Sequence, residues 1–258
     1  MKPLILVTND DGIRAKGLQA LVEMVKPFGQ VLVVAPEKGH SGQSHAITSD
    51  SPLRLREIVD YPESEAKVYA CSGTPVDCVK LAMSHLLSEE PDMIVSGVNH
   101  GSNSSVSVVY SGTMAAAQEG ALYGVPSVGF SLLDWTENPD FTASITVGRK
   151  IVQQVMQNGL KRDIALNVNI PVLPLGGIKG VKLCRQANGT WVEGYDKRID
   201  PRGGEYFWLR GDFVNNEPDA QDTDEWALNN GYVSIVPVQP DLTSYSELNR
   251  LKMEWNLE

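Results

Sequence analysis

The chain has 258 residues, of which 42% are hydrophobic and 21% charged, and no apolar run approaches the roughly 18 residues of a membrane-spanning helix. Its formal net charge is -10 and its lysine and arginine residues are scattered, so we expect neither long nucleic acid nor a membrane among its partners. The N-terminus carries no export signal and the three cysteines, Cys71, Cys78 and Cys184, form no CxxC pair, which predicts a cytoplasmic protein without a disulfide framework or a zinc cluster.

A short apolar run at the start of the chain, residues 4–7, leads into two adjacent carboxylates, Asp10 and Asp11. A run of Leu, Ile and Val predicts a strand buried on both faces of a parallel sheet, and ligands bind at the carboxyl edge of such sheets. A divalent cation is the simplest way to relieve the repulsion between adjacent carboxylates. Asp-Gly is equally a common turn dipeptide, so both interpretations stay open at this point.

Strand and helix patterns alternate along the first 170 residues. After the first strand, the sequence predicts strands over residues 30–35, 93–96, 125–132 and 165–170, and helices over residues 17–25, 75–86, 114–123 and 141–156. Thr74, Pro75 and Asp77 supply the N-cap, the first-turn proline and the acidic residue of a capping box. This alternation predicts an α/β fold in which helices cover both faces of a mostly parallel sheet.

The pattern changes after about Lys179. Residues 190–195 and 205–210 are rich in aromatic side chains and flank a turn-rich segment, residues 200–204, which predicts a β-hairpin arm. Because a two-stranded hairpin is only marginally stable alone, its aromatic residues need a packing partner, either the parent domain or another subunit. We favour the second subunit, because Tyr, Trp and Phe are enriched at interfaces.

Beyond the arm, Thr223 can cap a short helix, and residues 232–238 predict a final strand. The expected organisation is therefore a catalytic core over residues 1–180, a β-hairpin arm for oligomerisation over residues 181–220, and a C-terminal helix and strand segment over residues 221–258. This last segment returns to the core or to a neighbouring subunit.

Oxygen-bearing side chains follow three of the predicted strands. Asp10 and Asp11 follow the first, Ser41 lies in the long polar loop after the second, and Asn99 follows the third. If these strands are neighbours, their loops meet at one sheet edge, and the oxygen ligands suit Mg²⁺ or Mn²⁺. Ser41 could instead be a nucleophile, but no Ser-His-Asp order accompanies it, so we favour metal ligation.

A helix start at Ser111, Gly112 and Thr113 offers free backbone N–H groups, hydroxyls and the positive end of a helix dipole. It is either an ordinary capped helix or a seat for an anion. A metal beside an anion seat predicts phosphoryl chemistry, in which a metal-activated water attacks phosphorus and Asp10 or Asp11 accepts its proton.

Three histidines lie in predicted site loops, His40, His45 and His100, whereas His85 lies within a predicted helix. A histidine in such a loop could act as a general acid or contact phosphate, or simply be a polar loop residue. His100 is the better candidate for the acid because it directly follows Asn99.

Several ordered motifs, which together cover nearly the whole chain, resemble the stationary-phase survival protein SurE family, metal-dependent 5'/3'-nucleotidases. The motifs are VTNDDG at 7–12, APEKGHSGQS at 35–44, CSGTPVDCV at 71–79, SGVNHGSN at 96–103, YSGTMAAAQEG at 110–120 and DTDEWALNNGYVSIVPVQPD at 222–241. One departure is His40 before Ser41, where many members of the family have arginine.

The resemblance implies a Rossmann-like three-layer core and a hairpin arm exchanged between the subunits of a homodimer or homotetramer. It implies hydrolysis of nucleoside 5'- and 3'-monophosphates to nucleoside and phosphate, with some action on short polyphosphate. One divalent metal ion per subunit, Mg²⁺ or Mn²⁺, would be held by Asp10, Asp11, Ser41 and Asn99. The residues implied to bind substrate or phosphate are Asn9, Ser41, Asn99, Asn103, Ser111, Gly112 and Thr113.

Three other protein classes place carboxylates after a first strand. A receiver-type signalling module also binds Mg²⁺ there, but it is about half this length and needs a phosphoacceptor Asp after the third strand and a Lys after the fifth. A zinc-dependent deacetylase would need histidine ligands around the acidic pair. A haloacid-dehalogenase-type phosphatase needs an Asp-x-Asp pair, whereas Asp10 and Asp11 are adjacent.

Overall fold

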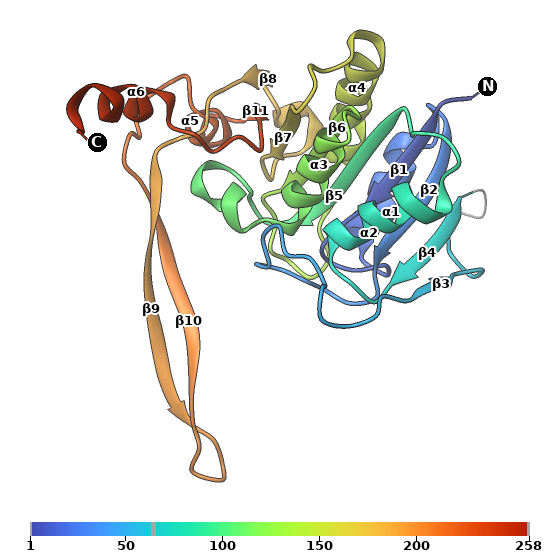
Figure 1. Cartoon of the computed structure of the whole chain (residues 1–258), viewed down its shortest axis with the longest axis horizontal. Coiled ribbons are helices and arrows are strands. Elements are labelled where there is room, and N and C mark those ends of the chain that lie inside the picture. Colours follow the sequence, from blue (N-terminus) through green and yellow to red (C-terminus); the bar gives the residue numbers. More distant parts are fainter. Residues whose placement is uncertain (1, 63–65, 257–258) are drawn as a thin grey trace.

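The computed structural model of the chain describes residues 2–62 and 66–256 and is built around a nine-stranded sheet in the order β3-β4-β2-β1-β5-β6-β7-β11-β8 (Figure 1). The strands are β1 Leu4–Thr8, β2 Gln30–Pro36, β3 Leu55–Glu57, β4 Lys67–Cys71, β5 Met93–His100, β6 Ser127–Leu132, β7 Ala165–Ile170, β8 Gly180–Leu183 and β11 Tyr232–Val238. Neighbouring strands run parallel except at the pairs β3–β4 and β7–β11. The prediction of a mostly parallel α/β sheet is confirmed.

Helices cover both faces of this sheet. Their bounds are α1 Lys16–Val25, α2 Pro75–Leu81, α3 Gly112–Leu122, α4 Thr142–Asn158, α5 Asp224–Asn229 and α6 Tyr245–Glu254. Helices α1 and α4 pack on one face of the sheet, and α2 and α3 pack on the other, so the core has three layers. Among the described residues, no helix combines the length and apolarity needed to cross a membrane.

Strand β1 shows how the apolar runs build two cores. Ile5, Leu6 and Val7 have no exposed surface. Because successive side chains of a strand point to opposite faces, Ile5 and Val7 join the core beneath α1 and α4, and Leu6 joins the core beneath α2 and α3. Each such burial stabilises the fold by about 1.5–3 kcal/mol. The three cysteines are also buried, and each has a free thiol.

The capping box predicted at the start of α2 is present. The hydroxyl of Thr74 accepts a hydrogen bond from the backbone N–H of Asp77 (3.2 Å), and the Asp77 carboxylate accepts one from the backbone N–H of Thr74 (2.9 Å). Pro75 occupies the first helical turn. The apolar face predicted for this helix continues past Leu81 through a π-helical turn, Ala82–Leu86.

Strands β9 (Gly189–Ile199) and β10 (Glu205–Asn215) form a separate antiparallel hairpin that projects from the body of the protein (Figure 1). Both strands extend further than the aromatic segments predicted, because backbone pairing continues through polar residues that carry no strand signal. Aromatic side chains of the hairpin, including Tyr195, Phe207 and Trp208, are exposed.

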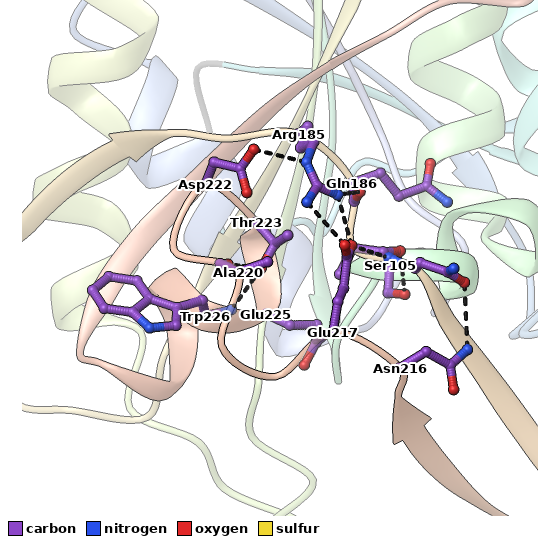
Figure 2. Close-up of polar contacts among 12 residues, drawn as sticks. Ser105, Arg185, Gln186, Asn216, Glu217, Ala220, Asp222, Thr223, Glu225 and Trp226 are labelled. Atoms are coloured by element: carbon purple, nitrogen blue, oxygen red, sulfur yellow. Dashed lines mark hydrogen bonds and ion pairs between the residues drawn. The ribbon is translucent and has the colours of Figure 1, made fainter.

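Charged side chains tie the start of the hairpin to its end, as Figure 2 shows. Arg185 donates two hydrogen bonds to the carboxylate of Glu217 (2.6 and 2.9 Å) and one to that of Asp222 (2.8 Å). The backbone N–H of Asn188 also donates to Glu217 (2.6 Å). The Arg185 guanidinium lowers the pKa of Glu217 to about 2. The chain on either side of the hairpin is therefore clamped where it leaves the sheet.

Among the described strands and α-helices, β3, β4, β8 and α6 were not predicted from sequence. Strand β3 is a short edge strand, β8 is half exposed, and α6 buries no residue, so none of them carries a strong periodic signal. Strand β4 does bury Val68 and Ala70, but Lys67 and Tyr69 alternate with them, so it lacks the continuous aliphatic run that marks β1.

Candidate active site

Three neighbouring strands bring the predicted site residues to the carboxyl edge of the sheet. Strand β1 lies between β2 and β5 and parallel to both, so the chain leaves all three on the same side. A cavity of about 760 Å³ opens there. Of the predicted site residues, Asp10, Ser41, Asn99, His100, Asn103 and Ser111 line it. The remaining four, Asn9, Asp11, Gly112 and Thr113, are not part of its lining.

Asp10 is held against the start of α3. The residue is 3% exposed, and its carboxylate accepts a hydrogen bond from the hydroxyl of Thr113 (2.5 Å). A Cβ atom on Gly112 would lie 2.8 Å from the Cβ of Asp10, so only glycine permits this approach. Burial raises the pKa of Asp10 to about 6. The charge of Asp11 acts in the same direction, whereas the hydrogen bond from Thr113 acts to lower this pKa. The carboxylate is therefore costly to ionise without a cation beside it.

Asp11 is tied to the end of β5. Its carboxylate accepts a hydrogen bond from the backbone N–H of His100 (3.3 Å), and burial raises its pKa. The register of β5 against β6 shifts between Ser96 and Asn99, which re-aims the last residues of β5 at the edge of the sheet. The acidic pair and the Asn99 strand end are thus linked directly.

Two asparagines have oxygen atoms to offer a cation. The side-chain amide of Asn99 donates to the carbonyls of Gly101 (2.9 Å) and His100 (3.3 Å), and these bonds leave its Oδ1 available. Asn9 donates to the carbonyl of Gly12 (3.0 Å), while its own buried Oδ1 has no hydrogen-bond partner among the described residues.

The donor set fits a hard cation. It combines carboxylate, amide and hydroxyl oxygens, which Mg²⁺ and Mn²⁺ prefer. Within residues 2–62 and 66–256, no cluster of three or more His, Cys, Asp and Glu side chains could hold a metal ion. A cation at Asp10 and Asp11 would therefore need the oxygen atoms of Ser41 and Asn99.

The loop that carries Ser41 is fastened at both ends of the cavity. The backbone N–H of His40 donates to the carbonyl of Asp10 (2.7 Å). Ser44, in the left-handed region at a φ of 52°, donates through its N–H to Tyr110 (3.1 Å) and through its hydroxyl to Val109 (2.7 Å). Ser41 is exposed but lies between these two attachments, so its position is constrained.

A buried carboxylate holds the same loop to the helices. Glu119 of α3 is 4% exposed and pairs with His45 of the loop (2.9 Å) and Lys80 of α2 (2.7 Å). Burial acts to raise the pKa of Glu119, but the bonds from His45 and Lys80 outweigh it and hold that pKa below its ordinary value. No spacing in the sequence signals this cluster, because its three members come from separate segments.

Ser111 caps α3 as predicted. Its hydroxyl accepts a hydrogen bond from the backbone N–H of Met114 (3.0 Å), and its side chain lines the cavity. The helix that follows has eleven residues, so its dipole directs positive potential at the cavity beside Asp10. The cap and the anion seat are therefore compatible, because the Ser111 hydroxyl can still donate its proton to an anion.

Residues 5–193 match the sequence model of the family described as Survival protein SurE. The chain belongs to the SurE family. The matched stretch includes every residue that the sequence analysis placed at the site, and the resemblance stated from the motifs is confirmed.

Full-length relatives carry the same family name. A 5'-nucleotidase SurE of Christiangramia forsetii is 52% identical over 99% of this chain and 98% of its own length. A 5'-nucleotidase SurE of Flavobacterium psychrophilum is 50% identical over the same shares of the two chains. The crystal structure of the SurE protein from Aquifex aeolicus matches with a TM-score of 0.81 at 38% identity, over 97% of this chain and 99% of that one.

In this SurE family protein, Asn103 has a supporting position. Its side-chain amide donates to Ser131 (2.8 Å), its backbone N–H donates to Asn169 (2.8 Å), and its carbonyl accepts from Asn167 (2.8 Å). Asn167 and Asn169, both buried in β7, were missed from sequence because polar residues within an apolar strand run read as part of the strand. They fix the loop that follows Asn99.

The histidines have different environments in this SurE family chain. His100 lines the cavity, and its ring packs against Phe141 at a centroid distance of 5.8 Å. His40 contacts Gln43 within its own loop (2.8 Å), His45 pairs with Glu119, and His85 is exposed in the π-helical turn. His100 is thus the histidine of these four that lines the cavity.

The cavity also contains residues that the sequence analysis did not assign to the site. They include Trp135 in the loop after β6, Trp191 and Phe213 from the hairpin, and Glu225 of α5. The position of Trp135 just after a predicted strand was an available signal, since β6 runs parallel to β5 and ends at the same edge. Trp191, Phe213 and Glu225 reach the cavity only through tertiary packing.

Proposed function

We propose that this protein is a divalent-metal-dependent 5'-nucleotidase that hydrolyses nucleoside 5'-monophosphates to nucleoside and phosphate. Relatives about 50% identical over their full length carry that activity in their names, and nucleotidases of the SurE family depend on a divalent metal. The observation that carries the proposal is the single cavity that joins Asp10, Ser41 and Asn99 to the start of α3 at Ser111.

The side chains divide the work. Asp10, Asp11, Ser41 and Asn99 would hold one Mg²⁺ or Mn²⁺ ion, which polarises a phosphoryl oxygen and lowers the pKa of water when bound. The Ser111 hydroxyl and the first backbone N–H groups of α3, at Gly112 and Thr113, hold the phosphate oxygens, and Asn9 and Asn103 support the surrounding loops.

Two proton transfers complete the proposed reaction. One of Asp10 and Asp11 accepts the proton of the attacking water, and His100 donates a proton to the leaving oxygen of the nucleoside. His100 suits this role because it lines the cavity beside Asn99. Action on 3'-monophosphates and on short polyphosphate is part of the proposal, since these substrates present the same terminal phosphate to the same residues.

Replacement of Asp10 by Asn tests the proposal. The substitution keeps an acceptor for the Thr113 hydroxyl but removes the charge, so metal-dependent phosphate release from 5'-AMP should fall at least about 100-fold. A chelator should do the same to the unmodified enzyme. The matched control is Asp163→Asn, an exposed carboxylate that should leave the rate unchanged. Full activity in the Asp10 variant or in chelator would refute the mechanism.

We also propose that the hairpin is exchanged between the subunits of a homodimer or homotetramer, and that the protein acts in the cytoplasm. In this proposal, residues 1–180 form the catalytic core and residues 181–220 form the arm. Residues 221–258 return to the core or to a neighbouring subunit. The support is the exposed aromatic surface of the hairpin, with Trp208 63% and Phe207 55% exposed. Sedimentation should show a smaller particle when residues 190–214 are replaced by a short turn. An unchanged mass would contradict the exchange.

A further inference from the structure

The active-site cavity extends well beyond the residues that would hold metal and phosphate. At about 760 Å³ it has room for a whole nucleotide rather than a phosphate alone. The rest of its lining includes a group of aromatic and aliphatic side chains, alongside Glu193, Arg210, Glu225 and several serine and glycine residues. The group comprises Tyr110, Leu133, Trp135, Trp191, Tyr195, Leu209 and Phe213. These aromatic and aliphatic side chains offer a nucleoside a surface for packing that the polar metal and phosphate residues do not.

The Trp135 ring packs against the loop that follows Asn99. A Cβ atom on Gly101 would lie 2.2 Å from the Trp135 ring, so the ring lies against a backbone position that only glycine leaves open. The carbonyl of Gly101 accepts the hydrogen bond from the Asn99 side chain (2.9 Å). The indole is therefore placed next to a proposed metal ligand by the same three-residue segment.

The loop that carries Trp135 is anchored, yet the side chain is largely open. The backbone N–H of Leu133 donates to Ile170 (3.0 Å), that of Thr136 donates to the Asp134 carboxylate (2.8 Å), and Lys16 of α1 donates to Asn138. Nevertheless, Trp135 is 78% exposed. A tryptophan that lines a cavity, rests against backbone at Gly101 and is otherwise exposed has the form of a stacking platform.

The other indole in the cavity has a different role. The Nε1 of Trp191 donates to the hydroxyl of Ser107 (3.2 Å), and its ring makes an edge contact with Phe213 at a centroid distance of 5.7 Å. These contacts fix the base of the hairpin to the segment before α3. Trp191 is thus already engaged in packing, whereas the exposed face of Trp135 is not.

We propose that Trp135 stacks on the nucleobase of the substrate and is a specificity-determining residue that favours nucleotides over other phosphate monoesters. This inference rests on the proposed function, because it assigns the second end of a nucleotide whose phosphate lies at Asp10 and Ser111. Stacking on an aromatic face tolerates every base, so the preference is for the presence of a base rather than for its identity.

Two ligands that differ only in the base provide the test. The KM for 5'-AMP and the inhibition constant of ribose 5-phosphate, as a competitor of 5'-AMP, are measured for the wild type, Trp135→Ala and Trp135→Phe. Loss of stacking should raise the KM for 5'-AMP about tenfold in the alanine variant, with kcat nearly unchanged. Ribose 5-phosphate should bind all three enzymes equally, and phenylalanine should restore most of the affinity for 5'-AMP.

The alternatives give distinct results. Equal weakening of 5'-AMP and ribose 5-phosphate would mean that Trp135 only supports the Asn99 loop, and it would overturn the inference, as would an unchanged KM for 5'-AMP. Trp255→Ala, which removes a 58% exposed tryptophan outside the cavity, serves as the matched control and should behave as wild type. If the wild type itself released no phosphate from any nucleotide, the proposed function would fail, and not merely the stacking.

Discussion

The sheet and the hairpin of this protein use the same kinds of side chain in opposite ways. Phe130 in β6 has no exposed surface, whereas Phe207 in β10 is 55% exposed. The sheet buries its apolar residues within the chain, and the hairpin holds together through the backbone pairing of β9 with β10 and a clamp at its base. The apolar side chains of the sheet therefore stabilise the folded chain, whereas the exposed aromatic side chains of the hairpin remain available for contact with another molecule.

Truncation of the two phenylalanines gives the largest expected contrast in stability. Phe130→Ala should lower the free energy of unfolding by about 3–5 kcal/mol, because it leaves a cavity in a close-packed core. Phe207→Ala makes the same chemical change on an exposed surface and should alter stability by less than about 0.5 kcal/mol in the isolated subunit. Urea denaturation at a concentration where the subunit is monomeric measures both. A large loss in the Phe207 variant would show that the hairpin is part of the core.

Gly112→Ala tests how closely the site depends on packing within the sheet region. The added methyl group would lie 2.8 Å from the Cβ of Asp10 and should displace that carboxylate. A shift of about 1 Å near the chemistry can reduce a rate about 100-fold, so we expect phosphate release to fall by that order. Gly176→Ala is the control, since no atom in the described part of the chain lies within 4 Å of its Cβ position. Activity close to wild type in the Gly112 variant would exclude tight packing between α3 and Asp10 as a requirement.

Glu119→Gln should have the smallest effect of the three, because it weakens only the attachment of the Ser41 loop. Loss of the charged bonds to His45 and Lys80 should cost about 1–2 kcal/mol of stability near neutral pH. The bonds hold the folded pKa of Glu119 below its ordinary value of 4.5, so their contribution is complete above that pH and is lost as the pH falls through the folded pKa.

The difference in stability between wild type and this variant should therefore shrink in acid, and thermal melts from pH 3 to pH 8 would measure it. The exposed Glu57→Gln variant should follow the wild type at every pH. A difference that stays constant down to pH 3 would mean that ionisation of Glu119 has no part in holding the loop.

Much of the fold could be predicted because its signals are local. Apolar runs such as residues 4–7 have the length of a buried strand, and the Thr74 capping box marks a helix start. Short or polar elements such as β8 and α6 escaped prediction, since few of their residues are buried and no periodic pattern arises. The antiparallel direction of β11 beside β7 likewise could not be predicted from the sequence, because β11 would bury the same side chains if it ran parallel to β7.

The sequence by itself determined the composition of the site: two adjacent carboxylates at one strand end, a serine and an asparagine at two others, and a capped helix start. The order of the sheet decided that these segments meet, and packing decided how, through the contact of Thr113 and Gly112 with Asp10 and the burial of Glu119 beneath the Ser41 loop. Packing also placed the Trp135 ring against Gly101. The physical reason is the separation along the sequence of the residues that interact. Helix caps and buried strands depend on residues that are neighbours in the chain, whereas these contacts join residues that are far apart in it. Such residues meet only when the whole core has formed.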